Sequence, residues 1–280
     1  MTTTTNAATG VGRTSFKDMI RKAAKLPPRI LLHAGNGWGK TSFAQWAPKP
    51  LNLCSANESG LDPLIECGLV PENDQIKVDS YGQLIEVLRG VAAGEAEGYK
   101  TLILDTVDGF EDLCREFVCQ RDHSGVWGRG GGGVEGFTAW SQGDRTVQFE
   151  VWPEVFRLLD QCSDEHGFMV ICLSHTRAAN RKNPDGFDYR VHAPQLRDEN
   201  SEYVVGWADI VIYGRREVEV TKDNKARGGR SRVMVTSESA TITAKNRYGL
   251  PEEIEADPTA KAAWDNFCTA MKEAKKGGPK

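Results

Sequence analysis

The stretch RILLHAGNGWGKTS, at residues 29–42, decides the fold of this chain. Its first five residues form a mostly apolar run of strand length, and the next eight match a phosphate-binding loop with alanine in the first small position. A helix is expected from Lys40 to Trp46, before Pro48 and Pro50 interrupt it. A strand, a glycine-rich loop and a helix in this order predict a site for the phosphates of a nucleotide.

The loop supplies three kinds of contact to a bound triphosphate. Its glycines let successive backbone N–H groups turn inward around phosphate oxygens, and the start of the next helix adds positive potential. Lys40 is expected to reach the β- and γ-phosphates, and the Thr41 hydroxyl to ligate Mg²⁺. The alternative is a glycine-rich turn that carries a lysine by chance. The expected ATP-binding residues are Gly35, Asn36, Gly37, Trp38, Gly39, Lys40, Thr41 and Ser42.

Apolar runs of strand length alternate with amphipathic segments along most of the chain. Strands are expected at residues 29–33, 51–54, 101–104, 168–173, 204–211, 218–221, 232–236 and 241–244. Helices are expected at residues 83–93 and 153–162, after Asp105, and near the C-terminus around Trp264. The polar segment 174–200 is expected to be mostly without regular structure. This order predicts an α/β P-loop NTPase fold, with a mainly parallel sheet, helices on both faces and an antiparallel C-terminal extension.

Composition bounds the class of protein. The 280 residues are 39% hydrophobic and 26% charged, which is typical of a globular protein. We expect a disordered tail at 1–12, one core at 13–256, and a C-terminal helix with a basic tail at 257–280. Apolar runs are too short for a membrane span, and the first residues lack a signal-peptide pattern. Seven cysteines without a C-x-x-C pair indicate reduced thiols and a cytoplasmic location.

Two acidic residues are candidates for the metal and the water of a hydrolytic site. Asp105 ends the apolar run TLIL, and the carboxyl end of such a strand lines the nucleotide crevice. A carboxylate there can hold Mg²⁺ through water, although aspartate also caps helices such as the one that begins near Val107. Glu58 follows the second strand and is the candidate base for the attacking water. The alternative for Glu58 is an ordinary solvated loop carboxylate.

The order of these elements and four short stretches resemble the RecA-type recombinase core. The stretches are ANESGLDP (56–63), TLILDTVDGF (101–110), ADIVIYGRREVEV (208–220) and TAKNRYGLP (243–251). The most similar group is the small phage-encoded RecA-like ATPases associated with single-strand annealing and recombination. The resemblance covers Arg29 to Pro251 and implies a RecA-like P-loop fold and an ATPase that uses Mg²⁺.

The resemblance also implies roles for single residues. Glu58 corresponds to the water-activating base and Asp105 to the magnesium carboxylate. Asp62 falls at a contact to adenine. His175 stands where the family has a glutamine that senses the γ-phosphate, and histidine can also donate a hydrogen bond there.

Two late cations match family positions that act across a subunit interface. Lys245 and Arg247 correspond to residues that reach the γ-phosphate of a neighbouring subunit, where a cation stabilises the charge of the transition state. This role implies self-association into a ring or filament. The alternative is an exposed basic hairpin.

Two segments are candidates for binding single-stranded DNA. The net charge of −4 gives no overall attraction to nucleic acid, so binding requires a local basic patch. The glycine-rich segment 123–136 and the loop after His175 lie where the family's DNA-binding loops emerge, and they carry cations and an aromatic residue that can stack on a base. The alternative is a pair of mobile linkers. The candidate residues are Trp127, Arg129, Arg177, Arg181, Lys182 and Arg190.

These observations favour an ATP-hydrolysing, RecA-like phage ATPase that binds single-stranded DNA in recombination or annealing. A single-strand binding protein is a further candidate partner, and no membrane partner is expected. One alternative is a P-loop ATPase that acts on a protein, as a packaging or assembly motor or switch. A second, disfavoured alternative is a small-molecule kinase, because no acceptor pocket or arginine-rich lid follows the phosphate loop. The catalytic candidates are Lys40, Glu58, Asp105, His175, Lys245 and Arg247.

Overall fold

The computed structural model describes residues 20, 25–56, 58–128, 135–183, 186–220 and 226–276, without the side chains of 218–220 and 226–230. The expected tail at 1–12 and Arg129 lie outside these ranges. Within them, no helix is both long enough and apolar enough to cross a bilayer.

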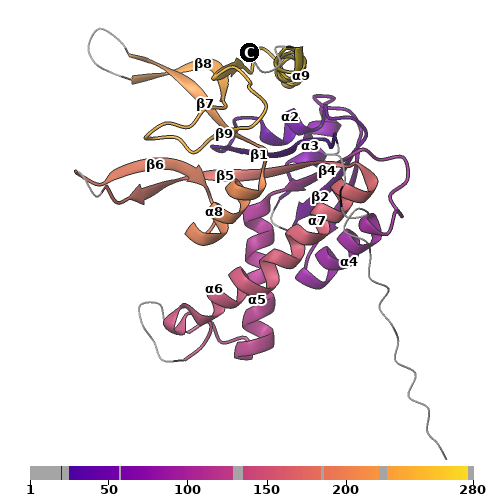
Figure 1. The fold of residues 1–280 in the computed structure, drawn as a ribbon, viewed down its shortest axis with the longest axis vertical. Coiled ribbons are helices and arrows are strands. Elements are labelled where there is room, and N and C mark those ends of the chain that lie inside the picture. The colour runs from indigo at the N-terminus through magenta and orange to yellow at the C-terminus, as the bar shows by residue number, and fades with distance from the viewer. Residues whose placement is uncertain are drawn as a thin grey trace, which may run out of the picture.

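One mixed sheet forms the centre of the molecule (Figure 1). Its strands run in the order β10-β8-β7-β1-β5-β4-β2-β3, and the six from β7 to β3 are parallel to one another. Strands β8 and β10 extend the sheet antiparallel, while β6 pairs with β5 and β9 pairs with β7. The strands are β1 (Arg29–Ala34), β2 (Pro50–Ser55), β3 (Asp74–Val78), β4 (Thr101–Asp105), β5 (Met169–Arg181), β6 (Tyr189–Pro194), β7 (Ile210–Val220), β8 (Ala226–Val235), β9 (Lys245–Asn246) and β10 (Glu253–Glu255).

Helices cover both faces of this sheet (Figure 1). One face packs against α4, α5, α7 and α8, and the other against α2 and α9. Successive residues of a parallel strand serve the two faces in turn: Leu102 and Leu104 face the first layer and Ile103 the second. The helices are α2 (Lys40–Ala44), α3 (Leu61–Glu66), α4 (Tyr81–Ala92), α5 (Val107–His123), α6 (Gln142–Thr146), α7 (Trp152–His166), α8 (Asp198–Trp207) and α9 (Ala260–Lys276), with short turns η1 (Ala139–Ser141) and η2 (Val147–Val151).

The predicted fold class is confirmed, including the helices on both faces and the antiparallel extension. Five of the seven cysteines are buried, namely Cys54, Cys114, Cys119, Cys162 and Cys172, whereas Cys67 is exposed and Cys268 is partly buried.

The prediction of an unstructured segment at 174–200 was wrong. Strand β5 continues beyond the sheet to Arg181, turns, and pairs antiparallel with β6 from Thr176 opposite Pro194 to Arg181 opposite Tyr189. A two-stranded hairpin that projects from the core needs few apolar side chains, so its sequence lacks the alternation by which strands are recognised.

Two later strand predictions were also wrong. The run at 204–211 is divided between the end of α8 and the start of β7, because Val204 belongs to a helical turn that is buried against the first helical layer. Residues 241–244 form only isolated bridges at Ile242, and the paired strand β9 follows at Lys245. The expected strands at 218–221 and 232–236 are parts of β7 and β8.

Parallel pairing brings the carboxyl ends of β1 and β4 to one edge, beside the middle of β5. Ala34 at the end of β1 lies opposite His175 on β5, and Asp105 at the end of β4 lies opposite Leu173. The loop after β1, the end of β4 and the middle of β5 therefore meet, as expected for a ligand crevice in an open parallel sheet.

Candidate functional site

A cavity of about 510 Å³ lies at this edge of the sheet. Its lining combines the loop after β1, the loop after β2, the end of β4 and the side chain at position 175 of β5. The lining residues are Asn36, Gly37, Gly39, Lys40, Thr41, Ser42, Glu58, Gly60, Leu64, Asp105, Thr106 and His175.

The loop after β1 folds tightly over a buried tryptophan. Gly37 and Gly39 have φ angles of 70° and 105°, a region that glycine enters without a steric penalty. Trp38 is only 3% exposed, and its Nε1 donates a hydrogen bond to the Arg215 carbonyl at 3.0 Å. A Cβ on Gly214 would lie 2.6 Å from the indole, so the strand beneath the loop requires glycine there. The Trp38 side chain therefore supports the loop from below, and the nucleotide contact predicted for this residue stays a prediction.

Two arginines that were not predicted as site residues hold the loop from outside. Arg216 donates to the Gly37 carbonyl at 2.9 Å, and Arg232 donates to the Trp38 carbonyl at 3.0 Å. Asp257 orients the second guanidinium through a 2.9 Å ion pair. Hydrogen bonds thereby connect strands β7 and β8 to the phosphate loop. These contacts can be recognised only in the folded structure.

Lys40 lies inside the loop and points toward the strand that precedes it. Its Nζ donates to the Ala34 carbonyl at 3.2 Å. Burial lowers the pKa of Lys40, while the nearby carboxylates of Asp105, Asp108 and Glu58 act in the opposite direction. Helix α2 has only five residues, so the main positive charge available to a phosphate is the Lys40 ammonium rather than a helix dipole.

Thr41 and Asp105 form the pair that was predicted to bind magnesium. The Thr41 hydroxyl donates to Asp105 Oδ2 at 2.7 Å. The other carboxylate oxygen, Oδ1, is buried and has no hydrogen-bond partner among the described residues. Burial raises the pKa of Asp105 to about 6, against the opposing effect of the Thr41 hydrogen bond.

These two side chains fit a divalent cation. A hard cation such as Mg²⁺ prefers carboxylate and hydroxyl oxygens, and the partnerless Oδ1 of Asp105 is an oxygen that such an ion would satisfy. When bound, Mg²⁺ would neutralise phosphate charge, with Thr41 and Asp105 holding it. The alternative role of Asp105 as a helix cap is not observed, since Thr106 caps α5 by accepting from the Gly109 N–H at 3.3 Å.

His175 lies between two carboxylates. Its backbone N–H and ring Nδ1 contact the two oxygens of Asp108 at 3.0 and 2.7 Å. Its Nε2 lies 3.9 Å from Glu58 Oε1. The hydrogen bond with Asp108 raises the pKa of His175; burial opposes this, and Glu58 adds to it. Asp108 was not predicted from the sequence, although it occupies the first turn of α5, three residues after Asp105.

Three predicted residues lie outside the cavity. Asp62 points to the far edge of the sheet, where it pairs with Lys77 at 2.9 Å and also accepts from Gln75, so its predicted contact to adenine finds no support. Lys245 donates to the last-turn carbonyls of α8, at Val205 and Gly206. Arg247 is half-exposed and pairs with Asp209 at 3.2 Å.

Lys245 and Arg247 lie near the amino ends of β1 and β7, opposite the phosphate loop. They cannot reach the cavity of their own chain along this sheet, so action on a phosphate requires a second copy. Lys245 is already engaged as a C-terminal cap of α8, which leaves Arg247 as the more available cation.

The candidate DNA residues differ in how accessible they are. Trp127 is 41% exposed and packs against Phe137, with ring centroids 4.9 Å apart. Arg177 pairs with Asp198, and Arg181 pairs with Glu202 at 3.0 Å. Lys182 and Arg190 are exposed at the end of the β5–β6 hairpin and make no ion pair with any described residue.

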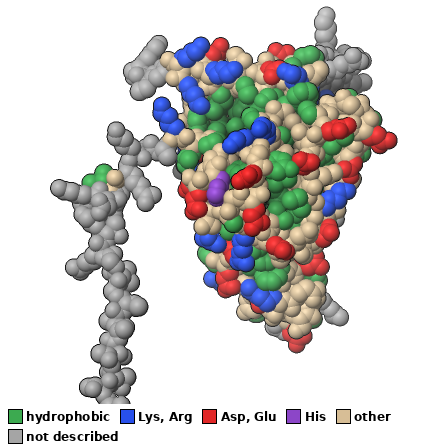
Figure 2. Space-filling model, turned by 90° about the vertical axis from the view of Figure 1, so that its right-hand side faces the viewer, with side chains coloured by type: hydrophobic (Ala, Val, Ile, Leu, Met, Phe, Trp, Pro, Cys, Tyr) green, Lys and Arg blue, Asp and Glu red, His purple; other side chains and the backbone are tan. Residues whose placement is uncertain are grey.

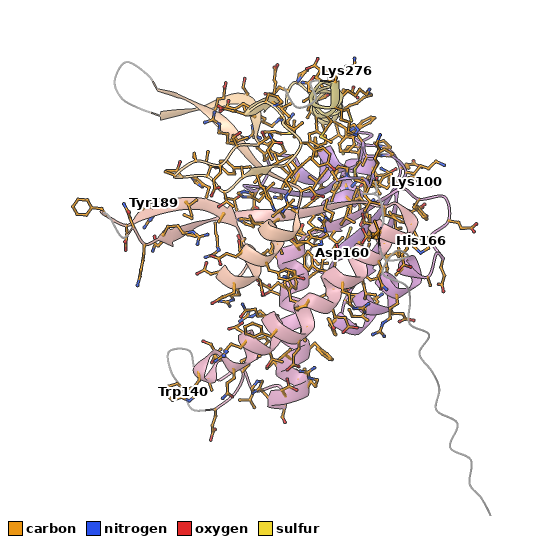
Figure 3. The ribbon with its side chains drawn as sticks, in the orientation of Figure 1. Lys100, Trp140, Asp160, His166, Tyr189 and Lys276 are labelled. Atoms are coloured by element: carbon orange, nitrogen blue, oxygen red, sulfur yellow. The ribbon has the colours of Figure 1, made fainter. Side chains whose placement is uncertain are left out.

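The hairpin also presents two aromatic residues that were not predicted. Phe187 is 97% exposed and Tyr189 is 40% exposed. Figure 3 shows Tyr189 at the outer end of the hairpin and Trp140 on a lower projection of the same side, away from Lys100 and His166. The opposite side has a different character. Figure 2 shows interspersed acidic and basic side chains around hydrophobic areas there, with no continuous basic surface among the described residues of that face.

A phosphate loop after β1, a paired threonine and aspartate, and a glutamate in one cavity define a P-loop nucleoside triphosphatase. Residues 26–248 match the model of the AAA_24 family, described as an AAA domain, and the chain belongs to this family.

Two known proteins are similar to the chain. One is the SPbeta prophage-derived uncharacterized protein YorG of Bacillus subtilis (strain 168), which is 29% identical over 188 residues. The match covers 66% of this chain and 49% of that protein, so the chain matches about half the length of this relative. The other is the crystal structure of the RadB recombinase, with a TM-score of 0.48, 9% identity, and coverage of 84% of this chain and 90% of that one.

Proposed function

We propose that this protein is a phage-type, Mg²⁺-dependent ATPase that couples ATP hydrolysis to single-stranded DNA in recombination or annealing. The observation that carries the proposal is the continuity of β5. This strand bears His175 in the nucleotide cavity and then extends into the exposed hairpin that ends in Lys182, Phe187 and Arg190. A movement of His175 in the cavity can therefore reach the hairpin along one continuous strand, β5.

The residues of the cavity have different roles in hydrolysis. Lys40 contacts the phosphates, and Thr41 and Asp105 hold the metal. Glu58 accepts a proton from the attacking water, and its position in the same cavity favours this role over a solvated loop carboxylate. The proposed substrate of this reaction is ATP.

The hairpin offers what sequence-independent binding of a single strand needs. Cations at Lys182 and Arg190 can follow the phosphates, and the ring of Phe187 can stack on a base. A strongly exposed phenylalanine on a hairpin has no role in the core, which favours a binding role. Arg247 acts in trans in a ring or filament of several copies, and a single-strand binding protein is a candidate partner.

ATP turnover measured with and without single-stranded DNA tests the proposal. We expect DNA to stimulate phosphate release and binding to weaken steeply with salt. Replacing Arg181 and Lys182 with alanine should reduce the salt slope by about 1 to 2, at ~0.7 per phosphate contact. The matched control removes two exposed lysines of α9, Lys272 and Lys275, and should leave the slope unchanged.

Aromatic substitutions should behave differently. Phe187→Ala or Trp127→Ala should weaken binding by about 1–3 kcal/mol if a base stacks there, with little change in salt slope. If the wild-type protein with ATP and Mg²⁺ binds no single-stranded DNA at low salt, the DNA-coupled function is refuted. An ATPase directed at a protein partner then takes its place, and a phosphorylated small-molecule product would instead indicate a kinase.

A further inference from the structure

We infer that Asp108 is a positioning residue of the nucleotide site, which fixes the His175 ring so that Nε2 faces Glu58 in the cavity. The inference rests on the proposed ATP hydrolysis, because it assigns the orientation of a group beside the reacting phosphate. Nothing in the phosphate-loop motif requires an acidic residue at position 108.

Asp108 contacts His175 at two points, the backbone N–H and the ring Nδ1. Asp108 receives the backbone N–H of His175 through one oxygen, at 3.0 Å, and faces ring Nδ1 with the other, at 2.7 Å. The carboxyl side chain is 11% exposed, so water competes little for these contacts. Burial acts to raise the pKa of Asp108, but the hydrogen bonds from His175 outweigh it and hold the pKa below its ordinary value.

An ionised Asp108 determines which ring nitrogen carries the proton. A carboxylate only accepts hydrogen bonds, so Nδ1 must be the donor in both the neutral and the charged ring. The neutral ring therefore has its lone pair on Nε2, and the protonated ring has an N–H there. In either state Nε2 faces Glu58, at 3.9 Å, and the lining of the cavity.

The charged groups around His175 favour its protonated form. The titratable groups that face it are Asp108 on α5, Glu58 in the loop after β2, and Lys40 at the start of α2. Two of the three are negative, and the hydrogen bond to Asp108 is the strongest influence. A protonated Nε2 can contact either Glu58 or an oxygen of the terminal phosphate.

The partner of the protonated His175 Nε2 links nucleotide binding to Glu58, the proposed general base. Without nucleotide, a protonated His175 ring is a counter-charge for Glu58 at 3.9 Å. A bound γ-phosphate offers a stronger negative charge, and Nε2–H then donates to it. Glu58 is released to accept a proton from water. Because His175 belongs to β5, the same exchange acts on the strand that continues into the hairpin.

An Asp108→Asn variant tests the inference by two independent readouts. Asparagine can accept from the backbone N–H with its oxygen, which leaves its amide to donate to Nδ1. The neutral ring should then carry its proton on Nε2, and its pKa should fall. Nitrogen-15 NMR of the full-length protein reports both properties for His175, with the signal assigned by comparison with His175→Gln.

The second readout is the pH profile of ATP hydrolysis. Wild-type turnover should decline as the pH rises through the pKa of His175, and the decline should begin at lower pH in Asp108→Asn. The variant should also lose turnover by about 10²-fold at neutral pH, as for a displaced catalytic group. His175→Gln should lack this decline, since glutamine does not titrate. Asp112→Asn, one turn further along α5 and mostly exposed, is the matched control and should match the wild type.

The outcomes separate the inference from the proposed function. A wild-type His175 whose neutral ring carries the proton on Nε2 overturns the inference, even if the variant fails to fold. An Asp108→Asn protein with an unchanged tautomer, pKa and pH profile does the same. If the wild type hydrolyses no ATP, the proposed function fails, while NMR still decides whether Asp108 fixes the His175 ring.

Discussion

Replacing Trp38 with alanine removes the side chain over which the phosphate loop folds. The indole is 3% exposed, and truncating a buried tryptophan costs about 3–5 kcal/mol in the free energy of unfolding. About 1 kcal/mol of this belongs to the hydrogen bond from Nε1 to the Arg215 carbonyl. The site lies at the edge of the sheet, where the loop can partly collapse into the space, so we expect about 3 kcal/mol.

The same substitution should weaken nucleotide binding. The carbonyls of Gly37 and Trp38 are held by two arginines only while the loop keeps its shape. If removal of the indole leaves the binding-competent loop populated about one tenth of the time, the affinity for ATP falls about tenfold. Trp38→Phe keeps most of the packing and loses the hydrogen bond, so it should cost ~1–2 kcal/mol.

Urea unfolding and calorimetric titration with a non-hydrolysable ATP analogue measure the two effects. Trp140→Ala is the matched control, because this tryptophan is 71% exposed and its loss should change stability by less than ~0.5 kcal/mol. The reasoning is refuted if Trp38→Ala unfolds within about 1 kcal/mol of the wild type and binds the analogue equally well.

Three further predictions concern single carboxylates and the interface. Glu58→Gln should bind ATP normally but hydrolyse it at least ~10²-fold more slowly, because an amide cannot accept the proton of water; unchanged turnover would return Glu58 to the solvated-loop interpretation. Burial raises the pKa of Glu111 to about 7, above its ordinary value, so the unfolded chain releases this proton first and stability should fall by about 3 kcal/mol as the pH rises from ~4.5 to ~7. Glu111→Gln should flatten this dependence in urea unfolding at several pH values, and a slope equal to that of the wild type would contradict it. Mixing Arg247→Ala with Lys40→Ala subunits should restore part of the ATP turnover if Arg247 acts in trans, whereas mixtures that co-assemble without recovery would argue against it.

The sequence predicted the nucleotide cavity well because its parts lie in local patterns. The phosphate loop is a contiguous motif, and Asp105 ends an apolar strand, so the edge of a parallel sheet brings them together. Glu58 was identified by its place after the second strand and His175 through the family resemblance, and both line the cavity.

Residues that act through long-range contacts could not be found in this way. Arg216 and Arg232 reach the loop from strands nearly 200 positions later in the chain, and no local pattern marks such a contact. Asp108 is recognisable only once β5 is placed beside α5. The β5–β6 hairpin was missed because its polar residues resemble a loop until the pairing is known.

Phosphate release from Mg·ATP by the wild type and by Lys40→Ala tests the central claim most directly. Lys40 donates only to the Ala34 carbonyl among the described residues, so the variant should remain folded by circular dichroism. If the protein is a P-loop ATPase, the wild type should hydrolyse ATP steadily in a reaction that requires Mg²⁺. The Lys40→Ala variant should lose almost all of this turnover. A folded Lys40→Ala protein that hydrolyses ATP at the wild-type rate would contradict the assignment of this cavity as the ATP site.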